Sequence, residues 1–307
     1  MLRRPIVFLA ISGIALCATV LEGCNKEDST TNTPAPVIVA PTNLRAFSAG
    51  PASVGLQWSL STSESDPSFV DYSLKVKNPG GSIISSQSVS KGSPQATVTG
   101  LSEGVIYTFV LRSTATGGVV SADSASISWS PARRLTTDST NGPPIQVYEF
   151  ASSSGASGLQ FNSVGGYART QSLNVSNPDR VLADVFLQTN GDGSISLNNM
   201  ATSGVGSAKN TFFSSVTRDA SDLDDPQLAP PLTSTYTLNT VTIPSATATQ
   251  AKILYARSVT DDKYVRILVQ RNPATSLLYY STSPNRYVRV QISYQNTAGN
   301  FFAKFAP

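Results

Sequence analysis

Apolar and polar residues alternate along short stretches throughout the chain, and three such stretches fall between residues 41 and 130. Their alternating apolar positions are Val54, Leu56 and Trp58, then Tyr72, Leu74 and Val76, then Tyr107, Phe109 and Leu111. Because successive side chains of a strand point to opposite faces of a sheet, this period of two predicts strands buried on one face. Turn residues such as "NPGGS" at 78–82 separate the stretches. The pattern predicts a β-sandwich over residues 41–130, with Trp58 as an anchor of its core.

Residues 145–307 show the same alternation in more numerous runs. In "YVRVQISYQ", Val288, Val290 and Ile292 alternate with polar neighbours. This pattern predicts a second antiparallel β-sandwich or open barrel of roughly eight or more strands. Long helical periodicity is absent from the sequence, so the predicted fold class is all-β. The stretch 200–235, rich in Ser, Pro and Asp, is expected to be a long loop.

The stretch from Leu101 to Tyr107, "LSEGVIY", resembles a segment of the fibronectin type III family. The resemblance covers about residues 41–130 and also rests on the spacing of Pro41, Leu44, Trp58 and Tyr72. It implies that Tyr107 forms a tyrosine corner, in which the hydroxyl bonds upstream backbone while the ring enters the core. Trp58 or Tyr107 could instead belong to a glycan-stacking platform, but both lie on the apolar side of an alternating strand, which favours the core. Modules of this family are mostly spacers or binding surfaces, and the fold alone does not choose between these roles.

An apolar run, Ile6–Leu21, follows the cationic pair Arg3-Arg4 near the start of the sequence. It is shorter than the roughly 20 residues that a membrane-spanning helix needs, so residues 1–23 are predicted to be a cleaved signal peptide. The run ends in Leu21-Glu22-Gly23-Cys24, which resembles a bacterial lipobox and implies that Cys24 is the lipid attachment site. Glu22 departs from that motif, which favours a small residue there. An unlipidated secretory signal and an uncleaved anchor are the alternatives.

The residues that follow the lipobox resemble the short export signal of surface lipoproteins in Bacteroidetes-type bacteria. The matching residues are Lys26, Glu27 and Asp28. The resemblance implies an outer-membrane lipoprotein that is exposed at the cell surface, whereas the alternative is a tether that is charged only because it is solvated. Residues 24–40 are predicted to be this polar tether, and residues 131–144, "PARRLTTDSTNGPP", a linker between the two β-domains at 41–130 and 145–307.

Charge and residue chemistry exclude several functional classes. Removal of residues 1–23 takes away two of the 22 basic and one of the 19 acidic residues, which leaves a net charge of +2. No basic stripe with interleaved aromatic residues occurs, so nucleic acid is not an expected partner. The sequence has no histidine, and its two cysteines are Cys17, in the signal peptide, and Cys24, so Ser-His, Cys-His and His-based zinc chemistry are unavailable. The protein is predicted not to be an enzyme and to carry no cofactor and no metal.

The C-terminal region contains the stretches "DKYVRILVQ", "RVLADVFLQTNGDGSISLNN" and "RYVRVQISYQNTAGNFF". These stretches are similar to segments of the haem-scavenging surface lipoproteins of the HmuY-like family. The family commonly ligates haem iron through two histidines, which this chain lacks. Met200, Tyr264 or the pair Tyr279-Tyr280 would be the remaining ligand types, but an aromatic residue in a strand is usually part of a core. The resemblance therefore implies a scaffold that binds something other than haem.

Three copies of an Asp-Ser-small pattern resemble the O-glycan acceptor sites of Bacteroidetes-type secreted proteins. They are "DST" at 28–30, "DSA" at 123–125 and "DST" at 138–140. Ser29 and Ser139 lie in the predicted tether and linker, where an acceptor is accessible, so both are predicted O-glycosylation sites.

Carboxylates cluster in "RDASDLDDP", which contains Asp219, Asp222, Asp224 and Asp225. Such a group could hold a hard cation such as calcium, which takes six to eight oxygen ligands. The spacing matches no calcium loop, so a solvated loop is expected instead.

These features favour a non-catalytic, surface-anchored lipoprotein in which the fibronectin-like module is a spacer and the C-terminal β-domain a binding head. Its partners would be the outer membrane, through the lipid, and an extracellular protein, glycan or small molecule. The alternatives are a structural component of an outer-membrane complex and a HmuY-like nutrient binder without histidine ligands. A hydrolase that works with two carboxylates is a third possibility, although no compact acidic constellation lies among aromatic residues.

Overall fold

The computed structural model describes residues 37–124, 126–206, 209–224 and 236–303. These residues form antiparallel strands joined by turns and short 3-10 segments, and no α-helix occurs among them. The all-β fold class is confirmed. The signal peptide, Cys24, the export residues Lys26, Glu27 and Asp28, and Ser29 lie outside the described residues.

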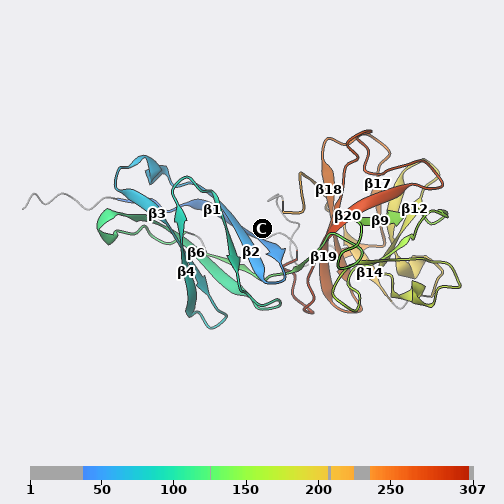
Figure 1. Cartoon of the computed structure of the whole chain (residues 1–307), viewed down its shortest axis with the longest axis horizontal. Helices are drawn as coiled ribbons and strands as arrows, with labels where there is room; N and C mark the ends of the chain where they lie inside the picture. The colour runs from blue at the N-terminus through green and yellow to red at the C-terminus, as the bar shows by residue number, and fades with distance from the viewer. Residues whose placement is uncertain (1–36, 125, 207–208, 225–235, 304–307) are drawn as a thin grey trace, which may run out of the picture. The chain divides into compact units, whose positions relative to one another are not determined.

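The first part of the described chain is a sandwich of two sheets (Figure 1). One sheet has the strand order β1-β2-β5 and the other the order β4-β3-β6-β7. The strands are β1 (Thr42–Gly50), β2 (Ser53–Ser59), β3 (Phe69–Lys77), β4 (Ile83–Ser90), β5 (Gln95–Thr99), β6 (Tyr107–Ala115) and β7 (Ile127–Trp129). The predicted alternation sets the core, because Leu56, Leu74 and Phe109 are all fully buried between the sheets.

The remaining strands form a C-terminal lobe of two further sheets. The smaller has the order β11-β10-β12-β13-β17, and the larger has the order β16-β14-β18-β19-β20-β8, with β15 beside β18 and β9 beside β20. The smaller sheet contains β10 (Gly158–Gln160), β11 (Arg169–Gln171), β12 (Val185–Thr189), β13 (Ile195–Asn199) and β17 (Thr240–Ile243). The larger contains β8 (Arg133–Leu135), β9 (Ile145–Tyr148), β14 (Thr211–Ser214), β15 (Arg218–Ala220), β16 (Tyr236–Leu238), β18 (Ala251–Ser258), β19 (Lys263–Val269) and β20 (Tyr287–Tyr294).

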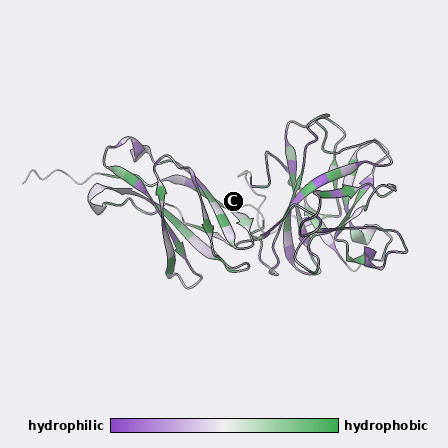
Figure 2. Ribbon diagram, viewed as in Figure 1, coloured by the Kyte–Doolittle hydropathy of each residue, from purple (hydrophilic) through white to green (hydrophobic). Residues whose placement is uncertain are grey.

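The core of the C-terminal lobe is built from the inner faces of these strands. Hydrophobic and hydrophilic residues alternate along β20 (Figure 2), so that Val288, Val290 and Ile292 enter the core while Tyr287 and Arg289 point to the other face. A smaller apolar cluster lies on that outer face, where Leu223 packs with residues of β15, β18 and β19.

Two segments expected to be irregular contribute strands. In the predicted linker 131–144, strand β8 pairs with β20, and Leu135 is buried in the core of the C-terminal lobe. In the predicted loop 200–235, β14 and β15 both pair with β18. Strands of three or four residues carry too few alternations to stand out from a loop, and in β8 only one of the three residues is apolar. The proposed domain limits themselves stay a prediction.

The segment after β20 returns to the first sandwich. Phe302 packs edge-on against Trp129, with ring centroids 5.2 Å apart, and is 9% exposed. Ser48 Oγ accepts a hydrogen bond from Trp129 Nε1 at 2.9 Å and donates to the Phe302 carbonyl at 3.1 Å. Gln295 Nε2 donates to the Pro131 carbonyl at 3.1 Å. All the described residues accordingly belong to one compact unit.

Candidate functional site

A cluster of tyrosines and arginines lies on the outer face of β9 and β20. Tyr148 and Tyr287 are paired across the two strands, and their ring centroids are 4.9 Å apart. Tyr280 stacks on Tyr287 at 5.2 Å with an interplanar angle of 10°. The Arg289 guanidinium carbon lies 4.6 Å from the Tyr280 ring centroid, because residues 287 and 289 share a face of the strand. The guanidinium of Arg289 therefore lies within cation–π distance of two tyrosine rings, Tyr280 at 4.6 Å and Tyr287 at 5.9 Å.

A groove of about 610 Å³ begins beside this cluster, and we call it the arginine groove. Its apolar lining includes Ala220, Ala251 and Leu268, from the outer surface of β15, β18 and β19. Its polar lining includes Arg271 and Arg289, Tyr280, Asp222 and the amides of Gln250, Gln270 and Gln291. The groove thus combines an apolar floor with cationic and amide groups.

Hydrogen bonds fix one end of the arginine groove. Arg271 Nε donates to the Ala248 carbonyl at 2.7 Å, and the Tyr280 hydroxyl donates to the Arg271 carbonyl at 3.2 Å. Burial raises the pKa of Tyr280, although Arg289 beside it acts in the opposite direction. Tyr280 is therefore a neutral phenol at physiological pH, and its hydroxyl adds no negative charge to the groove.

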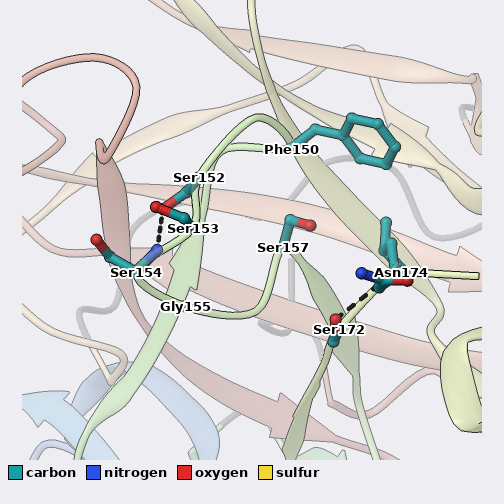
Figure 3. Close-up of a pocket in the computed structure, with 9 residues that line it drawn as sticks. Phe150, Ser152, Ser153, Ser154, Gly155, Ser157, Ser172 and Asn174 are labelled. Carbon is teal, nitrogen blue, oxygen red and sulfur yellow. Dashed lines mark hydrogen bonds between the residues drawn. The ribbon is translucent and has the colours of Figure 1, made fainter. Parts of the chain in front are cut away.

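A second hollow, of about 600 Å³, lies between the β9–β10 loop and the residues after β11; we call it the serine pocket. Figure 3 shows the turn at Ser152–Gly155 on one side, Ser172 and Asn174 on the other, and Ser157 between them. The lining contains no charged side chain. Phe150 is 48% exposed, and its ring meets the buried ring of Phe186 edge-on at 5.9 Å. The pocket offers hydroxyls, one amide and one aromatic ring.

The serine loop is fixed by the strands around it. Ser152 Oγ and Ser154 Oγ both donate to Asn285 Oδ1 at 2.9 Å, and Ser154 N–H donates to Ser152 Oγ at 3.0 Å. Gly155 lies so close to Tyr148 that an added Cβ would be 2.2 Å from its ring. No hydrogen bond involves the hydroxyls of Ser153 and Ser157 within the described residues, so these two are available to a ligand.

A buried ion pair lies directly beneath this loop. Glu149 is 1% exposed and the Arg286 side chain 9%, and Arg286 Nε lies 3.5 Å from Glu149 Oε2. Glu149 Oε1 accepts the Arg286 backbone N–H at 2.9 Å, and Oε2 accepts the Thr189 hydroxyl. Arg286 NH1 also donates to the Gly193 carbonyl at 2.5 Å. This network ties the end of β9 to β12, β20 and the turn before β13.

The residues predicted from the sequence in the first sandwich, and Ser139 in the segment after it, do not line either hollow. The Tyr107 hydroxyl accepts the Ser102 N–H at 3.0 Å while its ring is buried. Trp58 is 5% exposed and meets Tyr72 edge-on at 5.9 Å, so its ring faces are covered. Ser139 is half-buried in a turn, and its carbonyl accepts the Thr137 hydroxyl.

Three of the residues considered as haem ligands pack against other parts of the protein. Met200 is fully buried, Tyr264 packs edge-on against Tyr236 at 5.5 Å, and Tyr279 lies under the Arg286 guanidinium at 5.5 Å. Within the described residues, no group of three or more His, Cys, Asp or Glu side chains is placed to hold a metal ion.

The acidic side chains of 219–224 make local contacts. Asp219 forms an ion pair with Lys252 at 2.9 Å, and Asp224 forms one with Arg134. Asp222 Oδ1 accepts the Asp224 N–H at 2.7 Å, and Asp225 lies outside the described residues. The cluster predicted from the sequence is therefore divided between different partners.

Neither hollow could be predicted from the sequence. Tyr287 and Arg289 lie on the predicted polar face of "YVRVQISYQ", so their exposure could be inferred, but not the approach of Tyr280 from a loop. The run "SSSGASG" at 152–158 signals a loop and nothing about the pocket that it lines.

Comparison with known proteins identifies the first sandwich. The fibronectin type III family model matches residues 39–128. This segment is a fibronectin type III domain. A comparison with curated proteins gives no match. Domains of this type are typically non-catalytic interaction modules.

Solved structures similar to the chain are also fibronectin type III domains. The FN5 domain of Drosophila Lar is 18% identical, with 31% of this chain and 97% of that chain covered and a TM-score of 0.26. A Fn3-like protein from Clostridium thermocellum is 23% identical, with 30% and 92% covered and a TM-score of 0.25. The fn3 domain of the human collagen alpha-1(XX) chain is 19% identical, with 33% and 92% covered and a TM-score of 0.28.

Within the described residues, no helix has the length and apolar character needed to cross a membrane.

Proposed function

We propose that the protein is a non-catalytic lipoprotein of the cell surface whose C-terminal lobe binds a neutral glycan in the serine pocket. The fibronectin type III domain then acts as a spacer between the lipid at Cys24 and the binding lobe. The anchoring part of the proposal rests on the lipobox-like and export-signal-like residues 21–28.

The observation that carries the glycan assignment is the chemistry of the serine pocket. A neutral sugar presents many hydroxyls and no charge, and its ring has apolar C–H faces. The pocket offers the hydroxyls of Ser153 and Ser157 and the amide of Asn174 without a charged side chain, and Phe150 provides an exposed ring at the same hollow. Ligand sites typically combine a few placed polar groups with aromatic side chains in a cavity of roughly 300–1,000 Å³.

Binding is tested by titrating the mature protein with a panel of neutral oligosaccharides. Phe150→Ala should weaken binding of the best ligand by about tenfold, since it removes the aromatic contact. Val164→Ala is the matched control, because Val164 is exposed but does not line the pocket. Equal affinity of the two variants, or no neutral oligosaccharide bound by the unaltered protein, contradicts the assignment.

Surface display is tested by protease treatment of intact cells, with detection of the C-terminal lobe. The native protein should be cut, and a variant with Lys26→Ala, Glu27→Ala and Asp28→Ala should be protected. Protection of both proteins in intact cells but not in lysates would place the lobe in the periplasm.

A further inference from the structure

We propose that the arginine groove binds an acidic saccharide, with a sugar carboxylate held by Arg289. This site is separate from the serine pocket and takes a ligand of different charge.

The charge of the groove favours an anion. Two arginines, Arg271 and Arg289, line it together with one acid, Asp222. Among the described residues, neither arginine forms an ion pair with a carboxylate. Asp222 is exposed at the chain segment after β15, and its Oδ1 already accepts the Asp224 N–H. The groove therefore has an excess of positive charge for a ligand to meet.

The position and shape of the Arg289 guanidinium favour a carboxylate as the anionic group of the ligand. Its guanidinium lies over Tyr280 at 4.6 Å and Tyr287 at 5.9 Å, which restrains the side chain before a ligand arrives. Its Nε is buried, whereas the side chain as a whole is half-buried and lines the groove, so a ligand would meet the terminal nitrogens of the guanidinium. A planar guanidinium matches the two oxygens of a carboxylate, and such pairs are strong where water is excluded.

The remaining lining fits the body of a sugar. The side-chain amides of Gln250, Gln270 and Gln291 make no hydrogen bonds within the described residues, and each can donate and accept. Sugar hydroxyls donate and accept, so they can use both functions of the amides, whereas a simple carboxylate can only accept from them. Ala251 and Leu268 also line the groove and offer an apolar surface to the C–H face of a pyranose ring.

The test is calorimetric titration of the mature protein with short oligosaccharides of galacturonate, glucuronate and sialic acid, each beside its methyl ester. The ester keeps the size and the hydroxyls but removes the charge. At least one free acid should bind, its ester should bind at least about tenfold more weakly, and its affinity should fall as salt is added. Arg289→Gln should lower the affinity for the free acid at least about tenfold. Arg169→Gln, the same charge change at an exposed residue of β11 outside the groove, should alter it less than about twofold.

Absence of binding by all three acids, equal binding of acid and ester, or unchanged binding by Arg289→Gln would overturn the proposal. Since Arg289 also packs on tyrosine rings, the thermal midpoint of Arg289→Gln is measured first. If that variant is unfolded, Gln270→Leu with Gln291→Leu replaces it and should weaken binding several-fold. Phe150→Ala should leave acidic-sugar binding unchanged, so that failure of the serine pocket and failure of the groove are told apart.

Discussion

Removal of Glu149 should destabilise the C-terminal lobe strongly. In Glu149→Ala, the Arg286 guanidinium stays buried without its carboxylate, and the Arg286 N–H and the Thr189 hydroxyl lose their acceptor. Breaking a buried pair by removing one partner typically costs about 3–5 kcal/mol, and a buried N–H without an acceptor about 1–3 kcal/mol. These contributions overlap, and Arg286 keeps its bond to Gly193, so we expect a loss of about 4 kcal/mol in the free energy of unfolding.

The assay for this prediction must report on the C-terminal lobe. Both tryptophans of the chain, Trp58 and Trp129, lie in the first sandwich, so tryptophan fluorescence follows the wrong part. Urea unfolding followed by circular dichroism measures the loss of strands in both parts of the chain, and hydrogen exchange of the β9–β10 loop shows which of that loss belongs to the C-terminal lobe. The loop should exchange faster in Glu149→Ala, because Glu149 is its first residue and its carboxylate binds Arg286 and Thr189.

Two further variants make the Glu149 prediction refutable. Glu149→Gln keeps an acceptor for the Arg286 N–H and should lose less stability than Glu149→Ala. Asp219→Ala breaks an ion pair whose acid is 58% exposed, so it should cost less than about 1 kcal/mol. A Glu149→Ala loss no greater than that of Asp219→Ala would refute the reasoning, since the buried position would then carry no additional penalty.

Three other changes are expected to act through packing and charge. Tyr72→Phe removes a buried hydroxyl that accepts the Ser61 N–H at 2.8 Å. This change should lower the free energy of unfolding by about 1–3 kcal/mol in urea titrations, and a change below about 0.3 kcal/mol would disprove the prediction. Phe302→Ala should lower the free energy of unfolding by about 2–4 kcal/mol, which is detectable as a shift of the unfolding transition followed by tryptophan fluorescence. An unshifted transition would show that the contact between Phe302 and Trp129 does not stabilise the protein. Lys209→Met removes the cation 3.2 Å from buried Asp184, whose pKa burial raises, and should cost about 3 kcal/mol at pH 7. A carboxyl whose pKa is raised in the folded state stabilises that state at low pH, and this contribution is lost as the pH rises through the raised pKa. The loss of stability in Lys209→Met should therefore become smaller toward pH 4. A loss that is the same at every pH would contradict the prediction.

The first sandwich could be predicted further than the C-terminal lobe, and the reason is the length of its strands. Strands β3 and β6 have nine residues each, so their alternation is repeated often enough to be recognised. Strand β8 has three residues, and its pairing with β20 depends on a partner far along the chain. The two hollows share this difficulty, because Arg289 acquires its setting from Tyr280 on a separate loop, and Ser152 acquires its setting from Asn285.

The contact between Phe302 and the first sandwich has a consequence for the order of synthesis. Ser48 and Phe302 are joined by a hydrogen bond although they are 254 positions apart. At roughly 5–20 residues per second, a ribosome would complete the fibronectin type III domain about 9 to 35 seconds before it reaches Phe302. During that interval the part of the Trp129 side chain that Phe302 later contacts is not covered by Phe302. A nascent chain stalled before residue 300 should therefore hold a folded but uncapped sandwich, and the emission of Trp129 would record the moment at which the C-terminal segment arrives.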